Sequence, residues 1–257
     1  MPPSSPTALV TGGASGIGLA IVAGLARARW RVVVASRDPS RGGSPSQAGE
    51  PWSVDLSEIR TVRALAARVR RELPPLDAVV ACAGVWPARR IVTAAGLELG
   101  WAVNHVGHAA LVDALGPALA PAARIVVLSS GLHAGARIHW DDPSLARGFD
   151  ARAAYGQSKL ANLMYALALA RRQPTWRVNA IHPGVAQTGL HASPPAGAIS
   201  PAAAAKGPLA LLLDPRHAAT TGRYFDQLSV RRPAPHALDR ASQERLWGMT
   251  MAAIGRR

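Results

Sequence analysis

A glycine-rich segment near the N-terminus, set between an apolar strand and a helix, most strongly constrains the fold. Residues 7–10 are short and apolar enough for a buried strand, and residues 19–26 repeat apolar side chains at helical spacing. Gly12, Gly16 and Gly18 lie between them. A helix that starts at such a turn directs free N–H groups and its positive dipole end at an anion. The order therefore indicates a phosphate-binding turn, although a tight βα loop that needs only backbone freedom would look similar.

Strands and helices alternate through the remaining chain. The predicted strands after the first span residues 31–35, 51–54, 76–81, 124–128, 177–181 and 222–226. Predicted helices cover about 57–73, with Ser57 as N-cap, and 97–115, 153–172 and 202–213. Most of these strands are continuously apolar, which is typical of a parallel sheet covered on both faces. We predict an α/β fold: a single-domain, Rossmann-type, doubly wound parallel sheet over residues 1–257, with 190–207 as a substrate flap.

The charge balance alone would suggest a polyanionic partner. Lys and Arg total 29 against 15 Asp and Glu, a net charge of +14. Only Lys159 and Lys206 are lysines, and the arginines are scattered without a run of five or six. We therefore predict no nucleic-acid partner.

Membrane and secretory signals are missing from the sequence. The richest apolar stretch, residues 109–123, is interrupted by Asp113, Gly116 and two prolines, so we predict no membrane span. Residues 1–6 lack the basic start and apolar run of a secretory signal. Cys82 is the single cysteine and cannot form an intrachain disulfide. These features predict a cytoplasmic location.

The residues after the second strand discriminate between dinucleotides. An acidic residue about 20 positions beyond the glycine turn accepts from a ribose 2′-hydroxyl in NAD sites, whereas an arginine accommodates the 2′-phosphate of NADP. Ser36 and Arg37 occupy that place here. Asp38 could weaken this reading and Arg41 could share the role, and Arg37 could also be one more surface arginine. We predict NADP(H).

Tyr155 and Lys159 are four residues apart and hence on one face of the predicted helix 153–172. A free phenol has a pKa near 10 and exchanges protons poorly at neutral pH. A nearby ammonium group lowers the pKa of a phenol, so this spacing indicates general acid/base chemistry.

The sequence at this point resembles the short-chain dehydrogenase/reductase superfamily over nearly its whole length. The matching segments are residues 11–18, 82–84, Asn104, Ser129-Ser130, Tyr155 with Lys159, and 182–188. Within the superfamily it looks most like the retinol-dehydrogenase-like branch, through residues 104–108, 127–130, 158–162 and 221–225. Bacterial members resembling this branch include ketoreductases of polyketide tailoring.

The resemblance implies roles for four catalytic residues. Tyr155 would exchange the proton with the carbonyl oxygen, Lys159 would lower the pKa of Tyr155 and hold the nicotinamide ribose, and Ser130 would stabilise negative charge on that oxygen. Asn104 would hold a water that links Lys159 to solvent. The adjacent Ser129 could take the place of Ser130. The implied cofactor-binding residues are Gly12, Ser15, Gly16, Ile17, Gly18, Ser36, Arg37, Asp55, Leu56, Ala83, Gly84, Asn104, Tyr155, Lys159, Pro183, Gly184, Val185 and Thr188.

One position departs from the family pattern, which usually has asparagine where Cys82 stands. His105 and His108 lack a carboxylate or cysteine partner at ligand spacing, so we predict no metal site. Trp86, Trp140, His133 and Leu190 belong to segments expected around the substrate, and each could equally be ordinary packing.

The function predicted from these motifs is transfer of a hydride between NADP(H) and a carbonyl or alcohol group of an apolar or polyketide-like small molecule. The alternative is a catalytically silent, dinucleotide-binding regulator, which would have been free to lose the four catalytic residues. The subunit number is left open and includes a homo-oligomer.

Overall fold

One eight-stranded sheet organises the molecule. The computed structural model describes residues 5–38, 49–190 and 195–255. The strand order is β3-β2-β1-β4-β5-β6-β7-β8, and every neighbouring pair is parallel except β7 with β8. The strands are β1 (Thr7–Thr11), β2 (Arg31–Ser36), β3 (Glu50–Ser53), β4 (Leu76–Ala81), β5 (Leu119–Leu128), β6 (Arg177–His182), β7 (Arg223–Asp226) and β8 (Ser229–Arg231).

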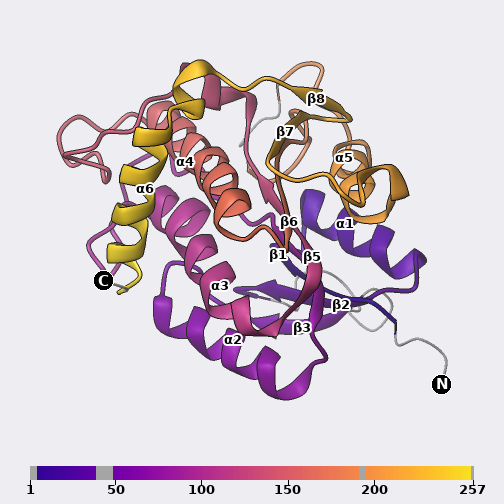
Figure 1. The fold of residues 1–257 in the computed structure, drawn as a ribbon. Helices are drawn as coiled ribbons and strands as arrows, with labels where there is room; N and C mark the ends of the chain where they lie inside the picture. Colours follow the sequence, from indigo (N-terminus) through magenta and orange to yellow (C-terminus); the bar gives the residue numbers. More distant parts are fainter. Residues whose placement is uncertain (1–4, 39–48, 191–194, 256–257) are drawn as a thin grey trace.

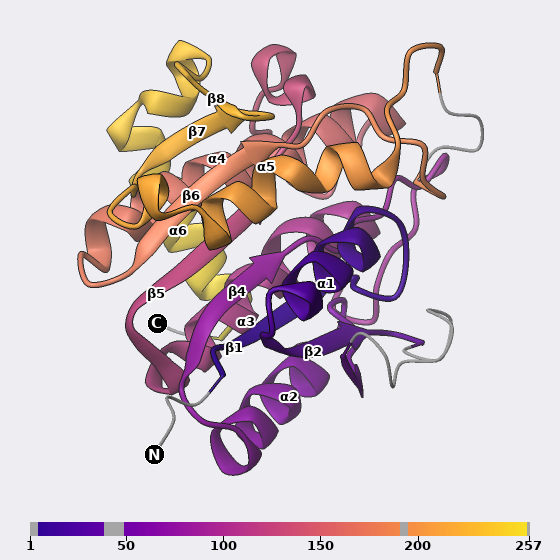
Figure 2. The same cartoon turned by 90° about the vertical axis from the view of Figure 1, so that its right-hand side faces the viewer.

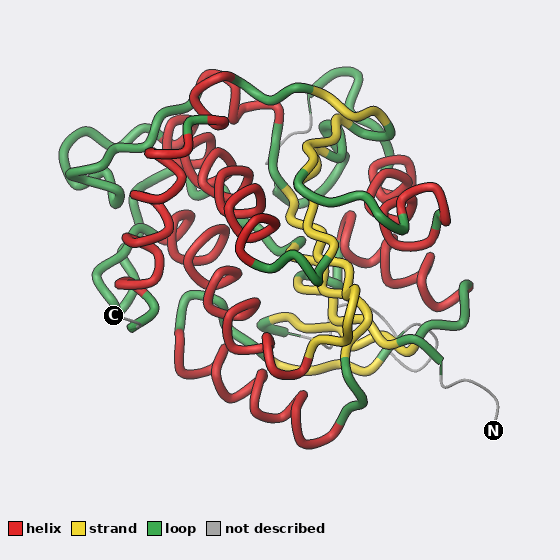
Figure 3. Tube along the Cα trace, viewed as in Figure 1, coloured by secondary structure: helices red, strands yellow, loops and turns green. Residues whose placement is uncertain are grey.

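Helices cover both faces of the sheet (Figures 1 and 2). On one face lie α1 (Gly16–Arg27) and α5 (Pro201–Leu213), which contact each other. On the other lie α2 (Ile59–Glu72), α3 (Gly107–Leu115) and α4 (Ala151–Arg172), and α6 (Arg240–Ala253) packs against α4. Figure 3 shows this three-layer arrangement by element type. The shorter helices are η3 (Trp101–Val106, a π-helix) and the 3₁₀ turns η4 (Gly116–Ala118), η5 (Gly131–Gly135), η6 (Pro215–His217) and η7 (Pro235–Leu238).

The core divides at the sheet because successive strand residues point to opposite faces. In β1, Leu9 packs with the cluster under α2, α3 and α4, whereas Ala8 and Val10 pack with the cluster under α1 and α5. Burial on both faces explains why the central strands have no polar alternation. The predicted α/β, doubly wound architecture is confirmed.

The structure also departs from several predicted elements. Ser57 does not cap α2: Glu58 takes that position, and the Ser57 hydroxyl donates to Asp55. Neither β8 nor α6 was predicted. All three β8 residues are exposed, and α6 buries only Gln243, Leu246 and Thr250, so neither has a clear apolar period.

The segment predicted to be a flap, residues 190–207, has two different parts. Residues 191–194 lie outside the described residues, and residues 201–207 form the first half of α5. Between them Ile199 bonds to the loop after β6, with its N–H donating to Val185 at 2.8 Å. Among the helices of the described residues, none is long and apolar enough to span a membrane.

The strand order reverses between β1 and β4, where the connection from β1 leads to β2 and the connection from β4 leads to β5. In open α/β sheets ligands bind outside the carboxyl ends of the strands at such a switch point. The loops that follow β1, β4, β5 and β6 all belong to this edge.

Candidate active site

The turn after β1 can exist only with glycine at particular positions. Gly12 has φ +67°, and a Cβ there would lie 2.8 Å from the Ala83 Cα. A Cβ on Gly18 would overlap the Gly12 carbonyl oxygen. The turn therefore lies directly against the loop after β4 and leads into α1. Ser15 precedes α1 and its side chain makes no capping bond, and Ile17 lies in the first turn of α1.

Thr188 lies against this same turn although it is 172 residues away in sequence. A Cβ on Gly16, whose φ is +52°, would be 3.0 Å from the Thr188 methyl group. Pro183, Gly184 and Val185 connect β6 to that threonine, with Gly184 at φ +92° and Val185 exposed. The structure thus brings Thr188, at the end of the loop after β6, next to the N-terminus of α1.

The predicted adenosine side lies at the carboxyl ends of β2 and β3. Ser36 Oγ is buried and has no hydrogen-bond partner among the described residues, and Arg37 is exposed. Asp55 Oδ1 accepts from the backbone N–H and the hydroxyl of Ser57 at 2.8 and 2.7 Å, and Leu56 is buried. Arg41, the other candidate for the 2′-phosphate, lies outside the described residues.

Tyr155 and Lys159 lie one turn apart on α4, whose N-terminus is capped by Asp150. The Lys159 ammonium lies 5.5 Å from the centre of the Tyr155 ring and donates to the Leu128 carbonyl at 3.1 Å. The loop after β4 closes over the pair: a Cβ on Gly84 would lie 3.6 Å from both Lys159 Nζ and Asn104 Oδ1.

Burial controls the protonation of both groups. It raises the pKa of Tyr155 well above the usual value, against a hydrogen bond from Ser130 that lowers it. It also lowers the pKa of Lys159 to about 8. Desolvation outweighs the lowering influence of Ser130 on this phenol. The buried phenol is accordingly held in its protonated, proton-donating form. That Lys159 lowers the pKa of Tyr155 beside a bound nicotinamide stays a prediction.

The two neighbouring serines after β5 have different partners. Ser129 is buried, and its hydroxyl donates to the Lys159 carbonyl at 2.8 Å. Ser130 is the residue bonded to Tyr155, and its Oγ also accepts the Leu132 N–H at 3.3 Å. Ser129 therefore secures the backbone of α4, and Ser130 faces the phenol.

Asn104 lies within the π-helix η3, where one extra residue per turn is accommodated. Its side chain is fully buried: Oδ1 accepts from the Val85 N–H at 2.8 Å, and Nδ2 donates to the Val85 carbonyl at 3.0 Å and to Ser158 Oγ at 2.9 Å. The amide is thus occupied by the loop after β4 and by α4. The backbone carbonyl of Asn104 lies 2.9 Å from His108 Nδ1.

Trp86 covers the Tyr155 ring. The two rings are stacked, with centroids 4.3 Å apart and planes 4° from parallel. Trp86 was predicted near the substrate only from its place after β4, and no spacing rule indicates the stack. Trp140 packs beneath Arg245 of α6, and His133 is buried against Tyr224, so these two serve packing.

Three features of this edge of the sheet fit a dinucleotide. The glycine turn and the N-terminus of α1 leave a backbone cradle that side chains would fill. Ser36 Oγ, a buried hydroxyl with no hydrogen-bond partner within residues 5–38, 49–190 and 195–255, lies where a ribose or its phosphate would be bound, next in sequence to the exposed Arg37. Gly84 places no side chain of its own against the Lys159 ammonium.

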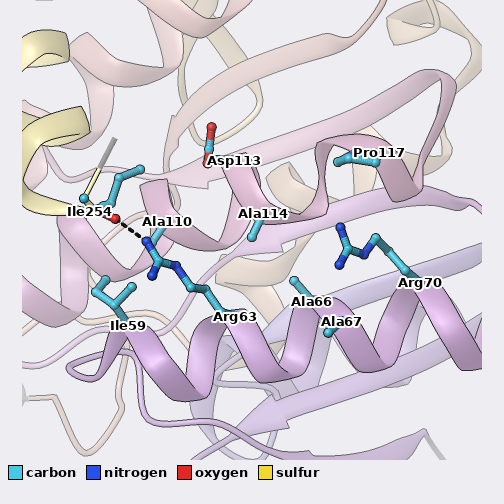
Figure 4. A pocket seen from close by; sticks show the side chains of 11 residues that line it. Ile59, Arg63, Ala66, Ala67, Arg70, Ala110, Asp113, Ala114, Pro117 and Ile254 are labelled. Atoms are coloured by element: carbon cyan, nitrogen blue, oxygen red, sulfur yellow. Dashed lines mark hydrogen bonds between the residues drawn. The ribbon is translucent and has the colours of Figure 1, made fainter. Parts of the chain in front are cut away.

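A separate groove of about 550 Å³ lies between α2, α3 and the C-terminal residues (Figure 4). Alanines form its floor, Arg63 and Arg70 border it, and Arg63 donates to the Ile254 carbonyl at 2.7 Å. None of its lining residues belongs to the predicted site. In the described part of the chain, no group of three or more His, Cys, Asp or Glu side chains could hold a metal ion.

The fold and this group of residues define a doubly wound α/β protein with a Ser-Tyr-Lys group at the switch point. The short chain dehydrogenase family model matches residues 6–197. The chain belongs to this family of oxidoreductases.

Curated relatives cover nearly the whole chain. Human retinol dehydrogenase 13 is 33% identical over 97% of this chain and 84% of its own length. A protein of Streptomyces sp. (strain C5), provisionally named daunorubicin C-13 ketoreductase DnrU, is 32% identical over 97% of this chain and 92% of its own. These similarities confirm the predicted resemblance to the retinol-dehydrogenase-like branch.

Solved structures agree on the fold. An uncharacterised protein from Mycobacterium paratuberculosis superposes with a TM-score of 0.83 at 26% identity, over 98% of this chain and 94% of that one. A short chain dehydrogenase from Burkholderia cenocepacia, crystallised in complex with NADP, has a TM-score of 0.70 at 23% identity, over 86% and 95% of the two chains.

Proposed function

We propose that this chain is an NADPH-dependent reductase of small-molecule carbonyl groups, or the reverse alcohol dehydrogenase. The observation that carries the proposal is the buried Tyr155 hydroxyl, bonded to Ser130 and one helical turn from Lys159. The relatives named retinol dehydrogenase and ketoreductase support an apolar or polyketide-like substrate. The single cysteine supports a cytoplasmic location.

The residues of the cleft would divide the cofactor between them. Gly12, Ser15, Gly16, Ile17 and Gly18 would bind the pyrophosphate, and Ser36 with Arg37 would bind the 2′-phosphate. Asp55 and Leu56 would border the adenine, and Ala83 with Gly84 the adjacent ribose. Pro183, Gly184, Val185 and Thr188 would hold the nicotinamide end. Bound NADPH supplies the hydride.

The chain's own residues would supply the proton and stabilise charge. Tyr155 donates its proton to the substrate oxygen as the carbonyl carbon is reduced, so the product gains one hydride and one proton. Ser130 donates a hydrogen bond to the same oxygen while negative charge develops there. Lys159 stabilises the phenolate that remains, and its own pKa of about 8 keeps it largely charged at neutral pH. Asn104 maintains the loop after β4 through its bonds to Val85.

The catalytic assignment is tested with Tyr155→Phe in a panel of aldehydes and ketones, assayed by NADPH absorbance. This variant should bind NADPH as wild type does and lose nearly all turnover. Tyr165→Phe is the matched control, because Tyr165 is buried against Trp247 and its hydroxyl lies 3.5 Å from the Ala109 carbonyl, a marginal bond. Full turnover in Tyr155→Phe would refute the assignment. NADPH binding without turnover of any carbonyl by wild type would instead indicate the regulator.

The cofactor assignment is tested with Arg37→Ala. Loss of the guanidinium should raise the KM for NADPH much more than the KM for NADH, because only NADPH carries the 2′-phosphate. Arg27→Ala changes an exposed arginine at the far end of α1 and should change neither value. Equal effects of Arg37→Ala on both cofactors would overturn the preference for NADPH.

A further inference from the structure

His108 is a buried histidine that joins the glycine turn to the π-helix. It is 3% exposed at the start of α3. Its Nε2 lies 2.8 Å from Thr11 Oγ1, the last residue of β1, and its Nδ1 lies 2.9 Å from the Asn104 carbonyl oxygen. Nothing in the proposed chemistry uses this ring, yet it touches both a residue beside the cofactor turn and a residue of the catalytic group.

The partners determine which ring nitrogen carries the proton. A carbonyl oxygen can only accept, so Nδ1 donates to Asn104. Burial lowers the pKa of His108 to about 4, so the ring is neutral at physiological pH and Nε2 is an acceptor. The Thr11 hydroxyl has one proton and two acceptors within reach, His108 Nε2 at 2.8 Å and the Val80 carbonyl at 3.2 Å, and we assign the proton to the nearer Nε2. The lone pairs of Thr11 Oγ1 accept from the backbone N–H groups of Cys82 and Ala83, at 2.9 and 3.1 Å.

These bonds form a closed circuit around the switch point. Thr11 holds Cys82 and Ala83, and the chain continues through Gly84 to Val85. Asn104 bonds both backbone groups of Val85, and His108 returns from the Asn104 carbonyl to Thr11. Buried hydrogen bonds that are all satisfied in this way rigidify their surroundings.

The circuit encloses the backbone that a cofactor would touch. Gly12 follows Thr11, and a Cβ on it would lie 2.8 Å from Ala83. Gly84 lies inside the circuit and beside Lys159 Nζ. A shift of the loop after β4 would therefore change both the width of the dinucleotide cleft and the cover of the catalytic lysine.

We propose that His108 is a positioning residue that sets the distance between the glycine turn and the loop after β4, and thereby the cofactor affinity, through its bonds to Thr11 and Asn104. The inference rests on the proposed NADPH function. The bonds to Thr11 and Asn104 require the neutral His108 ring with its proton on Nδ1. This tautomer is present in the free protein, before any cofactor binds.

The binding test measures NADPH dissociation constants by fluorescence titration. Thr11→Val and His108→Asn each break the bond between the two side chains, and His108→Asn keeps a donor near the Asn104 carbonyl. Each should weaken NADPH binding about tenfold, which corresponds to about 1.4 kcal/mol, with kcat at saturating NADPH within about threefold of wild type. His108→Phe removes both bonds and should lower kcat as well.

A double variant separates coupling from general damage. If the two side chains act through one bond, Thr11→Val with His108→Asn should bind NADPH no more weakly than Thr11→Val alone. His105→Asn is the matched control: His105 is a buried histidine of the preceding π-helix η3 that bonds Thr250 of α6 at 2.8 Å. It should lower thermal stability without changing NADPH affinity. The proposal would be overturned if the two substitutions weakened NADPH binding independently, so that their fold-changes multiplied in the double variant. It would also be overturned if His105→Asn lost as much NADPH affinity as the His108 variant.

The tautomer is tested without cofactor. Nitrogen NMR of ¹⁵N-histidine-labelled protein at pH 7, assigned by comparison with His108→Asn, should show His108 as the neutral Nδ1–H form. The Nε2–H form or a charged ring would refute the circuit. If the wild-type protein failed to bind NADPH, the proposed function would be refuted, although the NMR experiment could still show the Nδ1–H tautomer of His108. NADPH binding that is unchanged in every His108 variant would refute this inference alone.

Discussion

Lys159→Met should make the free protein more stable at neutral pH while abolishing activity. The Lys159 side chain is 4% exposed and burial lowers its pKa from 10.5 to about 8. Below pH 8, keeping the Lys159 ammonium charged in the folded protein therefore destabilises that protein by about 3 kcal/mol. Replacing the ammonium with a thioether removes that cost and loses the hydrogen bond to the Leu128 carbonyl, about 1 kcal/mol. The expected net gain at pH 7 is therefore about 2 kcal/mol.

This gain should disappear with rising pH. Between the folded pKa of about 8 and the unfolded value of 10.5, the unfolded wild-type chain binds the proton and the folded one does not, so wild-type stability rises with pH. By pH 9.5 wild type should have recovered about 2 kcal/mol relative to Lys159→Met. The sign follows from burial disfavouring the charged form.

Urea denaturation at 25 °C without cofactor, at pH 7.0 and 9.5, measures both values. The chain has only one other lysine, Lys206, which is exposed on α5, so Lys206→Met is the matched control and should show no such pH-dependent difference. The reasoning is refuted if Lys159→Met is less stable than wild type at pH 7. It is equally refuted if the difference between them is independent of pH.

Two further predictions concern the cleft. Gly18→Ala should abolish measurable NADPH binding in a fluorescence titration, since its Cβ would overlap the Gly12 carbonyl oxygen; wild-type affinity would contradict the observed turn. Trp86→Ala exposes one face of the Tyr155 ring, so the pKa of Tyr155, measured from tyrosinate absorbance by comparison with Tyr155→Phe, should fall, and Trp86→Phe should restore it. An unchanged pKa in Trp86→Ala would show that the stack does not control this phenol.

Local patterns were sufficient for the elements that position the site. The glycine turn, the apolar strands and the spacing of Tyr155 and Lys159 each depend on residues a few positions apart, and each was found where it was predicted. β8 and α6 were not predicted from the sequence, because their residues are largely exposed and are stabilised by distant elements. The prediction that Ser57 caps α2 was wrong, because the Ser57 hydroxyl donates its hydrogen bond to Asp55, two residues earlier.

By itself, the sequence determined the parallel α/β architecture and the order of the motifs, because periodicity and turn chemistry act over short stretches of chain. Only the tertiary structure decided that Ser130 rather than Ser129 faces the phenol, that Trp86 stacks on it, and that His108 bonds Thr11, 97 residues away. It also decided the protonation of Tyr155 and Lys159. Desolvation and hydrogen-bond partners depend on what surrounds a group in space, and no spacing along the chain encodes them.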